Sequence, residues 1–259
     1  MHVQTNGRRL YHDCFACFTP CPLQLRADPK VQALPEMDGL FRWRRIEAGD
    51  EIYGQDDLPE AAFVVSGGWV SLQRIVGDGR RHIIEFAVPG DLIGFSFSAG
   101  RKADHFAVAL TDVVLCVADH EALKRHLEAH HPLVEQVGAY LLAEQNLARQ
   151  QLTNITQNPA INRTANLLLQ LFVRVCGRSP VAGDSLAMPL TQEQIGDAIG
   201  LTAVHVNRML RQMRIDGVLT LKSGTLCVLD AAKFQELARF DVASVLDNGL
   251  REGLSRKQN

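Results

Sequence analysis

The stretch LTQEQIGDAIGL, followed directly by TAVHVNRMLRQMRIDG, constrains the fold of this chain more than any other segment. Thr191 is followed three residues later by Gln194, which is the spacing of a capping box, so a short helix is predicted to start at Thr191. Gly200 then supplies a turn residue, and Thr202 is placed to cap a second helix that runs to Gly217. Two short helices joined by a glycine-containing turn predict a helix-turn-helix.

A β-hairpin is predicted directly after the second helix. The apolar runs VLTLK and TLCVL flank the dipeptide Ser223-Gly224, which suits a two-residue hairpin turn. A helix-turn-helix with a following hairpin is the winged form of the motif. The combination is much more specific than either part alone.

The second helix of this unit is amphipathic. One side carries apolar residues that are expected to face inward, namely Val206, Met209, Leu210 and Met213. The opposite side is expected to enter the major groove of DNA, because the second helix of such motifs docks there. The candidate DNA-contacting residues of the unit are Thr191, Gln192, Thr202, Ala203, Val204, His205, Asn207, Arg208 and Arg211.

Arg208 is the residue best suited to reading a base. Its guanidinium fork matches the O6 and N7 acceptors of guanine, and such a pair contributes about 1–3 kcal/mol of discrimination. Asn207 can read an adenine edge, whereas His205 and Arg211 are expected to contact phosphates. The alternative is that these side chains form a solvated helix face without a ligand.

The part of the chain from about Leu40 to Val117 predicts a different kind of structure. Short runs such as AAFVV, WVSLQRIV, RHIIEFAV and FAVAL are rich in β-branched and aromatic residues, and glycine-containing turn signals separate them. Many short strands at near-regular turn spacing favour an antiparallel sandwich or roll. The N-terminal domain is therefore predicted to be all-β.

A long helix is predicted from Asp119 to about Gln157, where Asn158-Pro159 ends it. Its apolar residues recur at heptad intervals, and further apolar side chains flank them. The narrow seam can pair with the same helix of a second copy, or it can pack on the β-domain of its own chain. The heptad positions are Val134, Leu141, Ala148 and Ile155, flanked by Leu133, Val137, Tyr140 and Leu147. A further helix is predicted from Ile161 to Gly177.

Composition limits the remaining possibilities. The formal net charge is -2, so any charge that binds DNA must be local. No apolar run approaches the roughly 20 residues that span a bilayer, and the start of the chain lacks a signal-peptide pattern, so we expect a cytoplasmic protein without a membrane partner. The 6 cysteines are too sparse for a disulfide scaffold, which leaves thiols available for metal or redox chemistry.

The order of these features resembles the Crp/Fnr superfamily of transcription regulators along nearly the whole chain. PGDLIGF, the long helix, LTQEQIGDAIGLTAVHVNRMLRQM and the hairpin follow in the family's order. The resemblance implies an α+β protein with a cyclic-nucleotide-binding-like β-roll, a long dimerisation helix and a C-terminal winged helix-turn-helix domain. It also implies a homodimer, palindromic promoter DNA and RNA polymerase as partners. Two half-sites also suit the geometry, because one recognition helix reads few bases.

The expected domain boundaries follow from this architecture. An N-terminal cysteine-bearing segment covers residues 1–28, and the β-roll sensor domain covers 29–118. The dimerisation helix covers 119–157, the DNA-binding domain 158–240 and a C-terminal tail 241–259.

In the recognition helix, the best-known Fnr pattern has Glu, Ser and Arg where this chain has Val204, Asn207 and Arg208. Only the arginine is retained, so we expect a half-site that shares the guanine.

The sensor region departs from cyclic-nucleotide-binding members. Those members resemble one another in a Gly-Glu-Leu segment and an Arg-Ser pair that holds the phosphate. The matching stretch here, GDLIGFSFSAGRKADHFAVAL, lacks both features, although Arg101 and Lys102 lie within it. No cyclic nucleotide is therefore expected.

Cysteines suggest a different signal. Cys14, Cys17 and Cys21 form a C-x2-C-x3-C-P pattern, and Cys116 lies near the end of the predicted roll, where Fnr proteins place a fourth ligand. Four thiolates can hold a [4Fe-4S] cluster or zinc, because both prefer soft sulfur ligands. The resemblance favours a [4Fe-4S] cluster that responds to oxygen or redox state and controls dimerisation. Structural zinc, ligand-free thiols and a haem-based sensor are the alternatives.

An enzymatic function is the remote alternative. A β-roll rich in turn glycines could belong to a cupin enzyme, whose metal ligands include a His-x-His pair. His82 stands without such a neighbour, and neither a Walker loop nor an HExxH motif occurs. No enzymatic activity is expected. The two remaining cysteines, Cys176 and Cys227, have apolar neighbours and are expected to be core residues.

Overall fold

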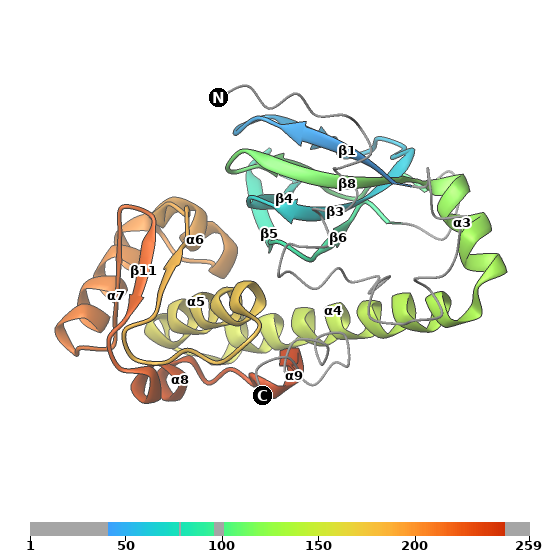
Figure 1. The fold of residues 1–259 in the computed structure, drawn as a ribbon. Helices are drawn as coiled ribbons and strands as arrows, with labels where there is room; N and C mark the ends of the chain where they lie inside the picture. The colour runs from blue at the N-terminus through green and yellow to red at the C-terminus, as the bar shows by residue number, and fades with distance from the viewer. Residues whose placement is uncertain (1–40, 78, 96–100, 247–259) are drawn as a thin grey trace, which may run out of the picture.

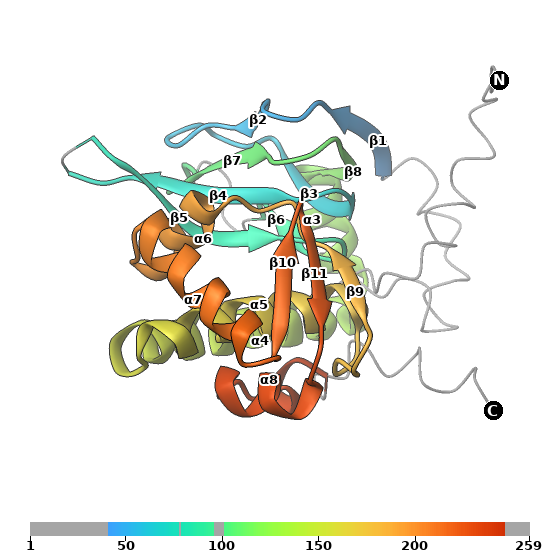
Figure 2. The ribbon, with the colours of Figure 1, turned by 90° about the vertical axis from the view of Figure 1, so that its left-hand side faces the viewer.

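The computed structural model describes residues 41–77, 79–95 and 101–246. The β-strands of the N-terminal half lie above a long helix, and the C-terminal half packs against one end of this assembly (Figure 1). A second view shows the helix α6 (Gln192–Ile199) beside the strand β5 (Arg81–Ala87), and the two elements are in contact (Figure 2). The expected β-roll, long helix and C-terminal helix-turn-helix unit are therefore present and contact one another.

The N-terminal domain is an antiparallel β-roll, which confirms the predicted all-β character. One sheet has the strand order β1-β8-β3-β6, and the other has the order β2-β7-β4-β5. The further strands are β1 (Phe41–Ile46), β2 (Glu51–Tyr53), β3 (Ala61–Gly67), β4 (Val70–Ile75), β6 (Leu92–Ile93), β7 (Phe106–Ala109) and β8 (Val113–Asp119).

Strand β8 shows how the sequence builds this roll. Val113, Leu115 and Val117 alternate along the strand and are almost completely buried in the apolar core between the sheets. The residues between them point to the other face of the sheet, because successive side chains in a strand alternate. Alternation of this kind gives each sheet an inner face that closes the core.

Two helices follow the roll where the sequence predicts one. Helix α3 spans His120–Ala129 and helix α4 spans His131–Gln157, with a break at His130. Pro132 lies in the first turn of α4. Its ring would clash with a preceding carbonyl inside a continuous helix, whereas the first turn of a new helix accommodates it. The predicted end is confirmed, because Asn158 has an extended backbone.

Helix α4 has two apolar faces rather than one. Val137, Tyr140 and Leu147 are buried against the rest of the chain. Leu141 and Leu152 lie on a different face and remain exposed. The side of α4 that packs on its own chain is therefore separate from the side on which apolar residues remain exposed. Among the helices that the structure describes, none is both long and apolar enough to cross a membrane.

The C-terminal half contains the predicted helix-turn-helix with a three-stranded wing. The wing has the strand order β10-β11-β9, and β9 was not predicted, because its three residues lie in a glycine- and proline-rich loop. The elements are α5 (Ala160–Cys176), β9 (Ser185–Ala187), α6, α7 (Ala203–Ile215), β10 (Leu219–Lys222), β11 (Thr225–Val228), α8 (Ala231–Ala238) and α9 (Ala243–Leu246).

The core of the DNA-binding unit continues into the roll. Phe172 and Met188 belong to the same buried apolar cluster as Trp69, Ile83 and Phe86 of the roll. A second cluster lies wholly between the two sheets. The C-terminal unit is therefore docked on the outside of β4 and β5 through apolar contacts.

Candidate nucleic-acid interface and sensor pocket

The predicted capping box forms at the start of α6. The Thr191 hydroxyl accepts a hydrogen bond from the Gln194 backbone N–H at 3.1 Å, and the Gln194 side chain accepts one from the Thr191 N–H at 2.9 Å. At the other end, Gly200 adopts the left-handed conformation that ends the helix. A β-carbon at Gly196 would collide with the Leu201 carbonyl oxygen, so the turn packs tightly on α6.

Helix α7 begins at the second predicted cap. The Thr202 hydroxyl accepts a hydrogen bond from the His205 backbone N–H at 3.3 Å, and it also bonds the His205 ring at 3.2 Å. Val206 and Met213 are completely buried, and Leu210 is nearly so. The predicted inward side of this helix is therefore confirmed.

The predicted DNA-contacting residues lie on the solvent side of α6 and α7. Val204 is 79% exposed, and Asn207, Arg208 and Arg211 are also exposed. Val204, Arg208 and Arg211 follow one another at intervals of four and three residues, so their side chains share one face of the helix. Thr191, Gln192, Thr202 and His205 are exposed at the starts of the two helices, and Ala203 is half-buried.

The wing turn has the conformation that a two-residue hairpin needs. Ser223 and Gly224 have φ values of 47° and 70°, and Lys222 pairs with Thr225 across the turn. Lys222 is exposed next to the tip. A cation at this place can contact a DNA phosphate, but the sequence analysis did not single it out because one lysine in a strand carries no signal.

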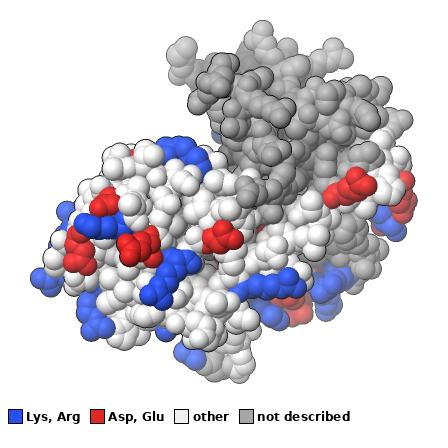
Figure 3. Space-filling model, turned by 90° about the horizontal axis from the view of Figure 1, so that it is seen from below, with Lys and Arg blue, Asp and Glu red and all other residues white. Residues whose placement is uncertain are grey.

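The view from below shows how charge is distributed over one face of the molecule. On the face seen from below, basic and acidic side chains of the described residues are interspersed with uncharged ones (Figure 3). This agrees with the formal net charge of -2. No large basic patch appears on this face of the described residues (Figure 3).

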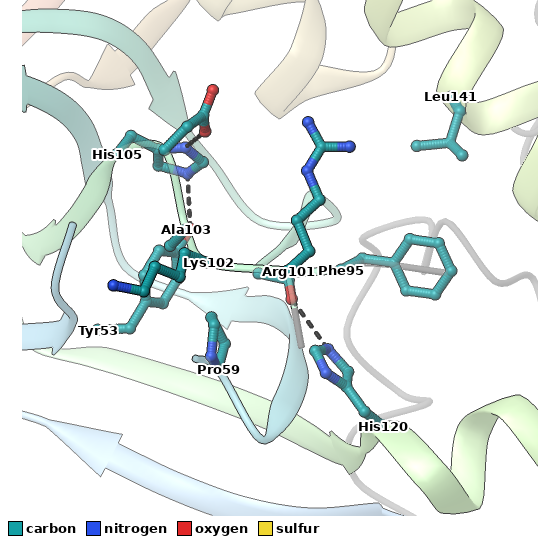
Figure 4. A pocket seen from close by; sticks show the side chains of 11 residues that line it. Tyr53, Pro59, Phe95, Arg101, Lys102, Ala103, His105, His120 and Leu141 are labelled. Carbon is teal, nitrogen blue, oxygen red and sulfur yellow. Dashed lines mark hydrogen bonds and ion pairs between the residues drawn. The ribbon is translucent and has the colours of Figure 1, made fainter. Parts of the chain in front are cut away.

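A pocket of about 360 Å³ lies between the roll and α4. Arg101 and Lys102 line it together with His120 and Tyr53, and Leu141 of α4 closes one side (Figure 4). His120 bonds the Gly94 carbonyl oxygen at 3.0 Å. The two basic residues noted in the sequence are thus brought to one cavity, while the expected absence of a bound cyclic nucleotide stays a prediction.

A short hydrogen-bonded chain forms one wall of this pocket. The Tyr53 hydroxyl bonds His105 Nε2 at 2.7 Å, and His105 Nδ1 bonds Asp104 at 2.7 Å. Burial raises the pKa of Tyr53 well above its usual range, so its hydroxyl stays neutral. The hydrogen bond from His105 lowers the pKa of Asp104.

Cys116 is the one proposed cluster ligand that the structure describes. It lies in β8 between Trp43 of β1 and Val64 of β3, half-buried on the outer face of the sheet. Phe41, where the described chain begins, packs against the same apolar cluster as Cys116. Cys14, Cys17 and Cys21 lie outside the described residues. Within those residues, no group of three or more His, Cys, Asp or Glu side chains could hold a metal ion.

Cys176 and Cys227 are each half-buried. Both contribute to elements of the DNA-binding unit rather than to the roll, Cys176 at the end of α5 and Cys227 in β11. Burial raises the pKa of the Cys176 thiol, which disfavours its thiolate. These two residues are therefore separate from the proposed cluster ligands.

Comparison with known proteins matches both halves of this arrangement. Residues 43–130 match the profile of the cyclic nucleotide-binding domain, and residues 162–237 match that of the Crp-like helix-turn-helix domain. The nitrogen fixation regulation protein FixK of Rhizobium meliloti is 30% identical over 174 residues, which are 67% of this chain and 76% of that relative.

Other relatives extend the match. The fumarate and nitrate reduction regulatory protein of Vibrio cholerae is 24% identical over 238 residues, covering 91% of this chain and 93% of that protein. The solved structure of FixK2 from Bradyrhizobium japonicum is 26% identical, with a TM-score of 0.69 over 76% of this chain and 96% of that chain. These relatives are regulators, which agrees with the expectation that the chain is not an enzyme. The chain belongs to the Crp/Fnr family of transcription regulators.

Proposed function

We propose that this regulator binds palindromic promoter DNA as a homodimer, with α7 of each protomer in the major groove of one half-site. The observation that carries the proposal is the exposed face of α7, with Arg208 one turn after Val204, on a helix capped at its start and flanked by a wing. Bound in this way, the dimer would present itself to RNA polymerase at the promoter.

The exposed seam of α4 supports the dimer. Leu141 and Leu152 are 38% and 65% exposed, and Val134 is 38% exposed on the same side of the helix. Val134, Leu141, Ala148 and Leu152 follow one another at intervals of seven, seven and four residues, which suits a coiled-coil seam. Pairing with the same seam of a second copy would remove this apolar surface from water.

Base reading and phosphate binding are assigned to different residues. Arg208 is proposed to read a guanine and Asn207 an adenine edge, because their side chains offer the matching donors and acceptors. His205, Arg211 and Lys222 are proposed to bind phosphates, which contribute affinity without sequence information. The valine at position 204 cannot accept a hydrogen bond from cytosine, so the half-site need not match the full Fnr consensus.

Selection from a pool of random DNA duplexes tests this part of the proposal. The purified protein should enrich a two-fold palindrome, and analytical ultracentrifugation should show two protomers on each selected duplex. Enrichment of no common sequence would contradict sequence-specific binding. Binding of one protomer to a single half-site would contradict the dimer.

We further propose that Cys14, Cys17, Cys21 and Cys116 hold a [4Fe-4S] cluster through which the protein senses oxygen or redox state. Sulfur ligands from four cysteines suit such a cluster, and they also suit zinc. The fit is supported by the position of Cys116 on the same face as Phe41, which follows Cys21 by about twenty residues and so leaves ample chain to reach it.

A cluster bound there would supply an oxygen-sensitive link between its ligands. The four cysteines would tie the N-terminal segment to the outer face of the sheet, where Cys116 packs against the apolar cluster that contains Leu123 and Leu127 of α3. Val137 of α4 belongs to the same apolar cluster. Ligand binding at the cysteines would in this way favour one packing of the dimer helix.

Anaerobic purification followed by iron, sulfide and zinc analysis tests the cluster. The expected result is about four iron and four sulfide per chain with visible absorption that oxygen bleaches. Cys116→Ser should lower the iron content, whereas Cys227→Ser is the matched control and should retain it. A colourless protein with one zinc per chain would contradict the oxygen sensor and support structural zinc.

A further inference from the structure

The interface between the DNA-binding unit and the rest of the chain contains a buried charge cluster. Arg174, in the last turn of α5, has a side chain that is only 3% exposed. Its Nη2 donates to Asp91 Oδ2 at 2.7 Å and to Glu85 Oε1 at 3.0 Å. Both acids belong to the roll, Glu85 in β5 and Asp91 in the turn before β6. One guanidinium therefore ties two halves of the molecule together.

Asp91, one of the two acceptors, is held in place by further hydrogen bonds. Asp91 Oδ2 also accepts a hydrogen bond from the Val88 backbone N–H at 2.6 Å, and the backbone of Asp91 bonds Val65 of β3 at 2.9 Å. The next residue, Leu92, donates its N–H to the Tyr140 hydroxyl of α4 at 3.0 Å. The position of Arg174 is thus fixed relative to α4 as well as to the roll.

Electrostatic attraction to the acidic side chains holds the charged guanidinium of Arg174 at this position. Burial by itself would lower the pKa of the guanidinium, but Asp91 and Glu85 more than offset that effect, and the pKa is raised. Glu144 of α4 faces the same cluster, and burial together with repulsion from Glu85 raises its pKa well above the usual range. The Arg174 guanidinium is therefore surrounded by three acidic side chains, and burial favours the protonated form of Glu144.

Apolar contacts alone would not fix the orientation of the DNA-binding unit. The interface also contains Trp69, Ile83 and Phe86, but apolar burial is non-directional and permits sliding of one surface over another. Charge-assisted hydrogen bonds are directional. Replacing a buried ion pair with apolar groups is often neutral for stability, so the charge cluster is better explained by geometry than by stabilisation.

We propose that Arg174 is a positioning residue, which fixes α7 relative to α4 through Asp91 and Glu85 and so sets the spacing between half-sites that the dimer accepts. The proposal rests on the dimeric DNA binding proposed above. Any shift of α7 relative to the α4 seam occurs once in each protomer and changes the separation of the two reading helices twice. Since one base pair advances the duplex by about 3.4 Å, a shift of about 1.7 Å in each protomer corresponds to one base pair of spacing.

The experiment measures affinity for duplexes that share both selected half-sites and differ only in spacer length, from two base pairs shorter to two longer than the selected site. Wild-type protein should prefer one spacer by about tenfold or more over its neighbours. The variant is R174M with D91N, because the amide oxygen introduced at position 91 can still accept the Val88 N–H and the Arg174–Asp91 pair is removed as a whole. Its preference should fall to about threefold or less, while base preference within each half-site is unchanged.

R178Q is the matched control. Arg178 lies just beyond the same helix and forms an ion pair with Asp184 at 2.7 Å, but both residues belong to the DNA-binding unit and the Arg178 side chain is largely exposed. This variant should keep the wild-type spacer preference. If the double variant does not fold, E85Q weakens the same tie at a side chain that is 36% exposed, and a smaller loss of spacer preference is expected.

A folded double variant, or a folded E85Q, that keeps the wild-type spacer preference would overturn the proposal. So would a loss of base preference equal to the loss of spacer preference, because that result indicates general damage to the reading helix. Failure of wild-type protein to bind any spacer would instead contradict the proposed DNA-binding function, and this outcome is distinguishable from the others.

Discussion

The helix-turn-helix and the interface that holds it on the roll are built from opposite kinds of contact. Within the helix-turn-helix, caps join residues three positions apart in the sequence. At the interface, Arg174 binds partners that lie 83 and 89 residues away. The first region is proposed to determine which bases are read, and the second to determine where the reading helix lies. Under these two proposals, local contacts determine base specificity, whereas long-range contacts determine the position of the reading helix.

The largest expected effect concerns the proposed dimer seam of α4, through which the second protomer brings its own reading helix to the DNA. Leu152→Glu places a charge in the exposed seam of α4, where a partner seam would bury it. The dimer should dissociate, and affinity for the palindrome should fall about 100-fold or more, because the half-sites are no longer bound by linked protomers. Sedimentation and fluorescence anisotropy measure the two effects.

Asn146→Glu is the control for this substitution, because Asn146 is exposed on a different side of α4. It should remain dimeric and bind normally. A dimeric Leu152→Glu variant with wild-type affinity would show that another surface pairs the protomers.

Base reading gives the next largest effect. Arg208→Ala should lose about 1–3 kcal/mol of discrimination at one base pair, since no other group of α7 replaces the guanidinium fork there. Its spacer preference should stay as in the wild type, in contrast to the Arg174 variant. Competition binding with every single-base variant of the selected site measures both properties.

Arg211→Ala distinguishes base reading from electrostatic attraction to the DNA phosphates. A phosphate contact should weaken binding to all sequences by a similar factor and reduce the salt dependence of affinity. Equal loss of discrimination in the two variants would show that the assignment of Arg208 as the base reader is wrong.

Much of the reading unit follows from the sequence because its signals are local. The cap at Thr191, the turn at Gly200, the cap at Thr202 and the hairpin at Ser223-Gly224 each depend on a few neighbouring residues. The break between α3 and α4 also had a local signal, Pro132, but the continuous apolar pattern concealed it. In the roll, turn glycines and alternating apolar runs predicted the strands.

The interface could not be predicted in this way. Arg174 is a single basic residue near the end of an apolar helix, and such a residue usually reaches solvent. Its burial depends on how α5 meets β5 and the turn before β6, which no local pattern specifies. The pocket beside Arg101 likewise depends on α4 lying across the roll.

Within the helix-turn-helix, removal of a helix cap should have a moderate effect on the free energy of unfolding. Thr202→Ala leaves the His205 N–H without its side-chain acceptor and should lower the free energy of unfolding by about 1 kcal/mol. Urea denaturation of the full chain measures it. Thr153→Ala is the control, because the Thr153 hydroxyl bonds the Arg149 carbonyl at an exposed position of α4 and contributes little. Equal losses in the two variants would show that the cap has no special role.

The smallest effect concerns the interface and depends on pH. Burial, and then repulsion from Glu85, raises the pKa of Glu144 in the folded protein well above its usual range. Protonated Glu144 is therefore favoured by folding. Its contribution is complete below the unfolded pKa of about 4.3 and is lost as pH rises through the higher folded value. Wild-type stability should accordingly decline over that range, because an ionised Glu144 adds a negative charge beside Glu85.

Glu144→Gln removes this titration while keeping the shape of the side chain. Near pH 4 the variant and the wild type should melt together, whereas at pH 8 the variant should have the higher Tm, by about 2–4 °C for each kcal/mol gained. Glu128→Gln, at an exposed position of α3, should show no such divergence. Parallel melting curves for Glu144→Gln and wild type across the whole pH range would contradict a protonated Glu144. Divergence without any change in base preference would show that the interface can be perturbed separately from the reading helix, as the contrast between long-range and local contacts requires.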